Sequence, residues 1–231
     1  MISKNIFQSW YTTNIPQPIQ NSINQMRRLN PEYSYYLFKD EDVNNYVNKS
    51  NYDNFLEAYN KLDIWASKID IWRYLILYNE GGVYLDIDAT IYASLNPLLN
   101  DGYSIITREG NPGKFVQWCL MFSKGHPVLK ICLDKCIKNI LSGEKSDITE
   151  KTGPAIFSES VTDFLNIPNA YYMSDDELNK NMVKTGLKFY FYDYKNFATC
   201  NQPYKHLLYT ERPYWRDEQK NKYGEIPLTK Y

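Results

Sequence analysis

The sequence predicts an α/β fold in which a mostly parallel central sheet is flanked by helices. Strand-like and helix-like segments alternate over about the first hundred residues. Hydrophobic residues make up 43% of the 231 positions, which is enough for a large core. A long helix-like segment also ends at a Gly-Gly pair that leads directly into an apolar run. Such alternation gives parallel strands that bind ligands at their carboxyl ends, and we expect one domain over residues 1–231.

The first half of the chain supplies the alternating elements. One helix ends before Pro31, because the residue before a proline disfavours the helical conformation. The next begins in "KDEDVNNYV", whose acidic first turn suits the positive end of a helix dipole. The longest helix ends at Gly81 and Gly82, since glycine accepts the backbone conformation that closes a helix. The predicted strands are 5–11, 33–38 and 83–93. Three helices are predicted: the first lies within 15–30, and the other two span 39–47 and 62–80.

The second half is more mixed. Apolar residues in "HPVLKICLDKCIKNIL" recur at helical spacing, which places Cys132 and Cys136 on a buried face. The four cysteines form no CxxC pair and only two histidines accompany them, so a structural zinc site is not expected. The tail from Asn201 onward is polar and aromatic and predicts a loop. The predicted strands are 103–108, 115–123 and 188–194, and the predicted helices are 126–141 and one that starts within 152–165.

Charge and hydropathy argue against two kinds of partner. The chain carries 26 basic and 27 acidic residues, without the basic excess that is typical of nucleic-acid-binding proteins. No segment reaches the roughly 18 apolar residues needed to cross a bilayer. The N-terminal segment also lacks the continuous apolar core of a secretory signal. We therefore expect a soluble, cytoplasmic protein without a transmembrane segment, and peripheral membrane association stays open.

The segment "YLDIDA" places two carboxylates, Asp86 and Asp88, inside an apolar run. A buried charge without a partner costs several kcal/mol, so the pair needs an explanation. Residues two apart on a strand point to the same face, and a divalent cation would remove the repulsion between the two side chains. Hard oxygen ligands favour Mg²⁺ or Mn²⁺, and such an ion could bind a diphosphate. The second Asp-x-Asp, residues 40–42, lies at a helix start, where capping explains it.

The predicted helix before this strand carries Asp70 and Arg73, three residues apart. Side chains at this spacing share one face of a helix, which here points towards the region of the following strand. The arginine could bind a carboxylate, a phosphate or a sugar hydroxyl. A plain ion pair within the helix is the alternative.

Together, "SKIDIWRYLILYNEGGVYLDID" resembles the central signature of glycosyltransferase family 32, the DXD-containing enzymes related to the yeast initiating mannosyltransferase. Flanking segments are also similar, namely "FQSWYT", "LNPEYSYYLFKDED", "GHPVL", "TGPAIF" and "HLLYTERPYW", so the resemblance covers most of the chain. The sequence departs from the family at Phe7, where a histidine is usual, and at "ERPY" before Trp215. The central matches are Asp70, Arg73, Gly81, Gly82, Tyr84, Asp86 and Asp88.

The resemblance implies a GT-A nucleotide-diphospho-sugar transferase fold and a metal-dependent, retaining hexosyltransferase. The donor would be a UDP- or GDP-sugar, the acceptor a glycan or other hydroxyl compound, and the cofactor Mn²⁺ or Mg²⁺. Residues 1–100 would bind the nucleotide-sugar, and 101–231 would form the acceptor side with a closing C-terminal tail.

The resemblance also implies roles for individual residues. Asp70, Arg73, Asp86 and Asp88 would be catalytic, with Asp70 and Arg73 holding hydroxyls of the donor sugar. Trp10 would stack on the base and Asp86 would contact ribose and sugar. Asp88 would bind the metal directly, with Asp86 and His206 as further metal candidates. The residues expected at the donor are Gln8, Trp10, Asp70, Arg73, Tyr84, Asp86 and Trp215.

Two other functions stay open at this point. "YLDIDAT" also looks like the first motif of haloacid-dehalogenase-type phosphatases, with Asp86 as the nucleophile and Asp88 as acid and base. In that family "SDDE" at 174–177 could supply a later acidic pair, although the motif usually follows the first strand of the domain. The other alternative is a sugar- or nucleotide-binding subunit that has lost turnover.

Overall fold

The computed structural model describes residues 2–99, 104–110, 112–143, 147–185, 189–200, 205–209 and 212–224. Its centre is a six-stranded sheet of order β2-β1-β3-β6-β5-β7. β1 pairs in parallel with β2 and β3, and β5 pairs in parallel with β7, whereas β6 runs antiparallel to both of its neighbours. The predicted mostly parallel sheet is therefore confirmed. The strands are β1 Asn5–Ser9, β2 Ser34–Phe38, β3 Gly82–Leu85, β5 Ser104–Arg108, β6 Phe115–Phe122 and β7 Phe189–Asp193.

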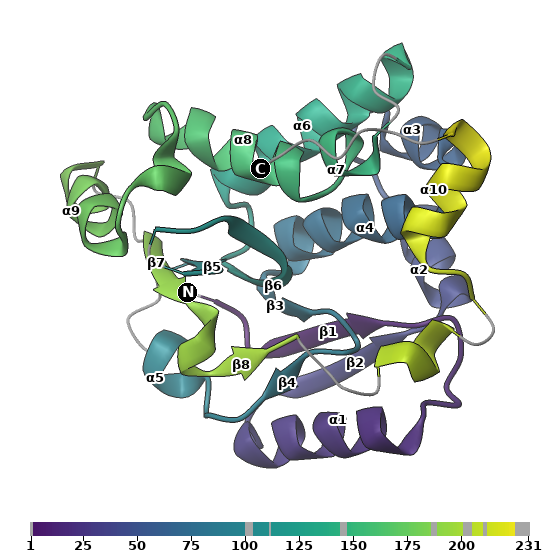
Figure 1. The fold of residues 1–231 in the computed structure, drawn as a ribbon, viewed down its shortest axis with the longest axis horizontal. Coiled ribbons are helices and arrows are strands. Elements are labelled where there is room, and N and C mark those ends of the chain that lie inside the picture. The colour runs from purple at the N-terminus through teal and green to yellow at the C-terminus, as the bar shows by residue number, and fades with distance from the viewer. Residues whose placement is uncertain are drawn as a thin grey trace.

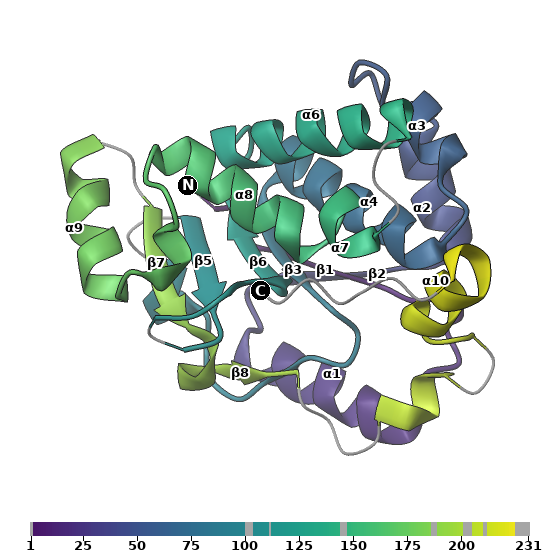
Figure 2. The same ribbon diagram turned by 45° about the horizontal axis from the view of Figure 1, so that its top comes forward.

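Helices cover both faces of this sheet (Figure 1). α1 (Gln17–Leu29) lies on one face, while α4 (Trp65–Glu80), α6 (Pro127–Ser142) and α8 (Pro154–Leu165) lie on the other, as Figure 2 also shows. A two-stranded sheet of β4 (Thr90–Ile91) and β8 (Ala198–Thr199) lies beside α1. The other helices are α2 Asp40–Val47, α3 Phe55–Lys61, α5 Asn96–Leu99, α7 Ile148–Lys151, α9 Asp175–Thr185 and α10 Trp215–Tyr223, with short 3₁₀ turns η1 Ala170–Tyr172, η2 Tyr194–Asn196 and η3 Lys205–Tyr209.

Each face of the sheet has its own hydrophobic core. On the α1 side, Ile19 and Ile23 of the helix pack with Val83 and Leu85 of β3. On the opposite side, α4, α6 and α8 bury a larger cluster that includes Cys132 and Cys136, as their helical spacing predicts. Among the described helices, none has the length and apolar character that crossing a bilayer requires. The division into halves at residues 1–100 and 101–231 stays a prediction.

The junction between α4 and β3 can be made only with glycine. Gly81 has φ of +66° and Gly82 has φ of +116°, in the left-handed region that side chains disfavour. A Cβ on Gly82 would lie 2.7 Å from the carbonyl oxygen of Asn5, and one on Gly81 would lie 2.7 Å from the amide nitrogen of Lys124. The Gly-Gly pair therefore lets α4 turn directly into the central strand.

We expect Gly82→Ala to lower the free energy of unfolding by about 2 kcal/mol or more, because backbone strain adds to a clash with a neighbouring strand. Gly143→Ala is the matched control, since Gly143 also has a positive φ of +71° but has nothing within 4 Å of an added Cβ. Urea denaturation of both variants checks this. Equal losses of stability in the two would mean that the close approach of β1 and β3 is not what requires glycine.

Several predicted elements differ from those observed. The strand predicted over 83–93 ends at Leu85, and a turn follows in which the amide of Ala89 donates to the carbonyl of Asp86 at 2.9 Å. If the strand continued through Asp86 and Asp88, both carboxylates would lie between packed helices. Because the strand ends at Leu85, they line a cleft instead. The long helix begins at Trp65 rather than Leu62, and the tail predicted as loop contains α10. α3 and α9 were not predicted.

Candidate functional site

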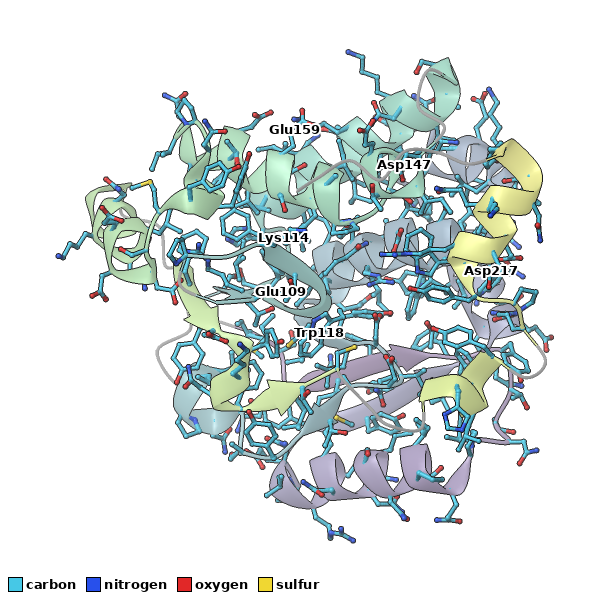
Figure 3. The ribbon with its side chains drawn as sticks, in the orientation of Figure 1. Glu109, Lys114, Trp118, Asp147, Glu159 and Asp217 are labelled. Atoms are coloured by element: carbon cyan, nitrogen blue, oxygen red, sulfur yellow. The ribbon has the colours of Figure 1, made fainter. Side chains whose placement is uncertain are left out.

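A cleft of about 1250 Å³ opens at the carboxyl ends of β1 and β3. One wall comes from the first half of the chain and contains six of the residues expected at the site: Trp10, Asp70, Arg73, Tyr84, Asp86 and Asp88. The opposite wall comes from the β5–β6 connection, the α7–α8 segment and α10. Figure 3 shows Glu109 and Lys114 from the first of these segments, and Asp147 and Glu159 from the second. It also shows Trp118 of β6, whose backbone carbonyl accepts a hydrogen bond from the amide of Asp86 at 2.8 Å. The cleft lies where a parallel sheet usually binds its ligand.

Arg73 connects helix α4 to the Asp-x-Asp turn. Its Nη2 lies 3.1 Å from Oδ1 of Asp70, and its Nη1 lies 3.2 Å from Oδ1 of Asp86. Nη1 also donates to the carbonyl of Gln117 at 3.1 Å, and the guanidinium lies over the ring of Tyr84 at 4.6 Å. Asp70 and Arg73 do form an ion pair within the helix. Arg73 also contacts Asp86, so the pair is joined to the turn that follows β3.

Asp70 is held by donors from three separate elements. Besides Arg73, it accepts hydrogen bonds from Nε2 of Gln117 on β6 at 2.8 Å and from Oγ1 of Thr152, after α7, at 3.0 Å. Burial raises the pKa of Asp70 to about 7, although Arg73 and these two hydrogen bonds act in the opposite direction. Gln117 and Thr152 are not among the residues expected from the sequence, although the polar position inside the apolar strand "FVQWCLMF" is a signal that marks Gln117.

The raised pKa of Asp70 predicts a pH-dependent contribution to stability. The native state binds this proton more tightly than the unfolded chain, so the contribution is complete below the ordinary value of 3.8 and is lost as the pH rises to about 7. We expect the difference in free energy of unfolding between wild type and Asp70→Asn to decrease across that interval, as measured by denaturation at a series of pH values. A constant difference would mean that Arg73, Gln117 and Thr152 keep the carboxylate ionised.

Asp86 is fixed through both its side chain and its backbone. The hydroxyl of Tyr84 donates to Oδ1 of Asp86 at 2.8 Å. Nε2 of Gln8 donates to the backbone carbonyl of Asp86 at 2.9 Å, while Oε1 of Gln8 accepts from the hydroxyl of Tyr35 at 2.9 Å. Gln8 is 1% exposed and supports the turn from behind, whereas Trp10 lines the cleft beside Tyr209. A contact between Gln8 and a donor stays a prediction.

The Asp-x-Asp turn lies beside Cys200. Asp86, Asp88 and Cys200 can each offer a ligand atom, and these atoms lie within 4.8 Å of one another. Two carboxylates and a thiol at this spacing fit a divalent cation, and a cation would offset the cost of placing two acidic groups side by side. Cys200 is not among the residues expected from the sequence, because nothing near it in the chain marks it as a ligand.

Two candidates from the tail have different positions. Trp215 begins α10 and lines the same cleft as Asp86 and Asp88, which suits a residue that covers a bound donor. His206 lies in η3 with an exposed side chain. Within the part of the chain that the structure describes, the metal-ligand group at the turn does not include His206. Both roles stay predictions.

A family model described as a glycosyltransferase sugar-binding region containing a DXD motif matches residues 16–105. This range contains the Asp86–Asp88 turn together with Asp70 and Arg73. Over these residues the chain is similar to the DXD-motif glycosyltransferases. Asp86-Ile87-Asp88 has the Asp-x-Asp pattern that gives the model its description, and the resemblance to the DXD-containing glycosyltransferases is confirmed.

Curated relatives of the DXD family match different shares of the chain. Inositol phosphoceramide mannosyltransferase 3 of Schizosaccharomyces pombe is 34% identical over 55% of this chain and 35% of its own length. Initiation-specific alpha-1,6-mannosyltransferase of Candida albicans is 24% identical over 87% of this chain and 61% of its own length. The chain thus spans less than two thirds of either relative.

A solved structure supports the fold of this chain. PaToxG glycosyltransferase superposes with a TM-score of 0.58 at 21% sequence identity, covering 80% of this chain and 75% of that one. This similarity concerns the fold, and it agrees with the GT-A architecture expected for the family.

Proposed function

We propose that the protein is a metal-dependent, retaining glycosyltransferase that moves a hexosyl group from a UDP- or GDP-sugar to a hydroxyl of a glycan or other acceptor. The observation that carries this proposal is the DXD turn at the end of β3, joined through Arg73 to Asp70 at the base of a cleft. The match of residues 16–105 to the DXD family and the names of the mannosyltransferase relatives support it.

Different residues of the cleft would bind different parts of the donor. Mn²⁺ or Mg²⁺ held by Asp86 and Asp88 would neutralise the diphosphate as it leaves. Trp10 offers an aromatic face for the nucleobase. Asp70 and Arg73 line the cleft in positions fixed by Gln117 and Thr152, so they can orient sugar hydroxyls without reorganising. Trp215 would cover the donor and exclude water, which limits hydrolysis.

The opposite wall of the cleft supports a neutral glycan as the acceptor. It combines the aromatic side chain of Trp215 with an excess of acidic over basic side chains. An acceptor that carries a phosphate next to its hydroxyl, as the name of one relative describes, would meet this excess of negative charge. The charged residues of this wall are Glu109, Asp147, Glu150, Glu159 and Glu218, against Lys114, Arg212 and Arg216.

The phosphatase alternative fits the geometry poorly. Asp86 would have to act as a nucleophile, yet its Oδ1 accepts from Tyr84 and lies 3.2 Å from Arg73. The later acidic pair would come from "SDDE", but Asp175 pairs with Arg108 at 2.9 Å instead. A binding subunit without turnover has the same cleft, so activity must separate it from an enzyme.

A panel of nucleotide-sugars with Mn²⁺ tests the proposed function. We expect one UDP- or GDP-sugar to raise the melting temperature and to be cleaved, slowly by water and faster with a neutral oligosaccharide acceptor. The panel includes an acceptor that carries inositol phosphate and a simple phosphate ester. Stabilisation without cleavage of any donor would support a binding subunit, and hydrolysis of the phosphate ester alone would support a phosphatase.

Metal and nucleotide should bind cooperatively. With few protein ligands, the cation should bind weakly until a diphosphate supplies further oxygens, and linkage requires each ligand to raise the affinity of the other by the same factor. Calorimetric titration of Mn²⁺ with and without UDP or GDP measures that factor. Equal Mn²⁺ affinities in all titrations would mean that the DXD pair does not share a metal with the donor.

A further inference from the structure

The pairing of β4 with β8 determines what lies next to the DXD motif. The two strands are antiparallel, with Thr90 opposite Thr199 and Ile91 opposite Ala198. The amide of Tyr92 extends this ladder by donating to the carbonyl of Phe197 at 3.0 Å. In this register the residue after Thr199 meets the residue before Thr90, so Cys200 is brought to the end of the DXD turn.

The contact of Cys200 with the motif is direct. Its Sγ lies 3.4 Å from Oδ1 of Asp88, a carboxylate that is 5% exposed. A metal held at about 2.3 Å from sulfur and about 2.1 Å from oxygen requires ligand atoms less than about 4.5 Å apart. The ligand atoms of Asp86, Asp88 and Cys200 lie within 4.8 Å of one another, so a small movement would close them around one ion.

We propose that Cys200 is the third protein ligand of the DXD cation and that its sulfur biases the site towards transition metals, Mn²⁺ among them, over Mg²⁺. This inference rests on the proposed function for the presence of a metal. Binding would replace the contact between Sγ and Asp88 by a sulfur–metal bond, and the thiol proton would leave to solvent. Sulfur ligands favour softer ions than carboxylates do, and divalent affinity rises from Mn²⁺ towards Co²⁺.

His206 is the competing ligand, because the sequence predicts it from the family pattern. Its side chain is exposed in η3 and lies outside the group formed by Asp86, Asp88 and Cys200. The other cysteines, Cys119, Cys132 and Cys136, are buried, and none of the four is in a disulfide. A thiol reagent added to the folded protein should therefore react with Cys200 and not with the three buried cysteines.

Cobalt spectroscopy separates the two candidate ligands. The full chain would be titrated with Co²⁺ in the presence of UDP and, separately, GDP. We expect wild type to show a sulfur-to-cobalt charge-transfer band. The band should be absent from Cys200→Ala and Cys200→Ser and present in the matched control His206→Ala. Cys200→Ala should weaken Co²⁺ binding about tenfold or more and change Mg²⁺ binding much less. Cys200→Asp should restore affinity for Mn²⁺ without restoring the band.

Alkylation provides a test that needs no variant. Iodoacetamide should modify wild type at Cys200, as located by peptide mass spectrometry, and Co²⁺ with nucleoside diphosphate should slow this reaction at least about tenfold. Absence of the charge-transfer band in wild type, unchanged Co²⁺ affinity in Cys200→Ala, or loss of binding in His206→Ala would overturn the proposal. A band and protection in a protein that cleaves no nucleotide-sugar would refute the proposed function and leave the ligand assignment intact.

Discussion

Asp88→Asn is expected to lower metal-dependent transfer on the order of a hundredfold or more while the fold is retained. Asp88 lies in the turn after β3, where its carboxylate belongs to the metal-ligand group. The substitution keeps the size of a side chain that is 5% exposed, but it removes the negative charge that would hold the cation. Initial rates of sugar transfer at saturating Mn²⁺, together with the melting temperature, measure the effect.

The second Asp-x-Asp of the chain supplies a matched control for this experiment. Asp42 occupies the same position in residues 40–42, but its carboxylate caps α2 by accepting from the amide of Lys39 at 2.9 Å. Asp42→Asn should therefore cost stability of about 1 kcal/mol and leave transfer unchanged. Near-normal turnover in Asp88→Asn would contradict the assignment of the metal site.

Arg73→Lys should lower turnover by roughly a hundredfold although the charge is kept, since a point charge cannot copy a planar fork. The guanidinium reaches Asp70, Asp86 and the carbonyl of Gln117 at once, from a position that is 7% exposed. Lysine has one nitrogen for all three partners, so the sugar-orienting side chains would lose their fixed arrangement. Steady-state rates with the preferred donor, and calorimetry with free UDP or GDP, separate turnover from nucleotide binding.

Arg108→Lys controls for the general cost of changing a buried arginine. Arg108 pairs with Asp175 and donates to the carbonyls of Gly113 and Tyr171, away from the DXD turn. Arg108→Lys should lower the free energy of unfolding about as much as Arg73→Lys does, but it should lower turnover much less. If Arg73→Lys weakens binding of free nucleotide as much as it lowers turnover, Arg73 serves the phosphates rather than the sugar.

The sequence alone predicted the half of the site that is contiguous in the chain. Asp70, Arg73, the Gly-Gly pair and the DXD motif lie on α4, β3 and the turn between or after them, so spacing sufficed to bring them together. The strand predicted through Asp86 and Asp88 was wrong, because apolar neighbours do not reveal where a strand leaves the core. The pair still converges through the turn.

The rest of the site depends on contacts between distant segments. Gln117 and Thr152 reach Asp70 from β6 and from the end of α7, and no local pattern identifies such partners. Cys200 arrives through a two-residue pairing that is too short to leave a periodic signal. α9 and α10 were missed because "DDELNKNMVKT" and "WRDEQKNKY" are mostly polar and show little of the apolar stripe on which helix prediction depends.

The β4–β8 ladder also has a consequence for the order in which the molecule assembles. Asp88 and Cys200 are separated by 112 positions, and closing so long a loop is a slow, entropically costly step. On a ribosome, β1, α4 and β3 can pack before residue 200 has been synthesised. The cation site would then be completed last, when β8 pairs with β4. A bound ion would hold Cys200, which is synthesised late, against Asp88, which is synthesised early. Hydrogen exchange should accordingly be slower at the β8 amides in the metal-loaded protein than after chelation.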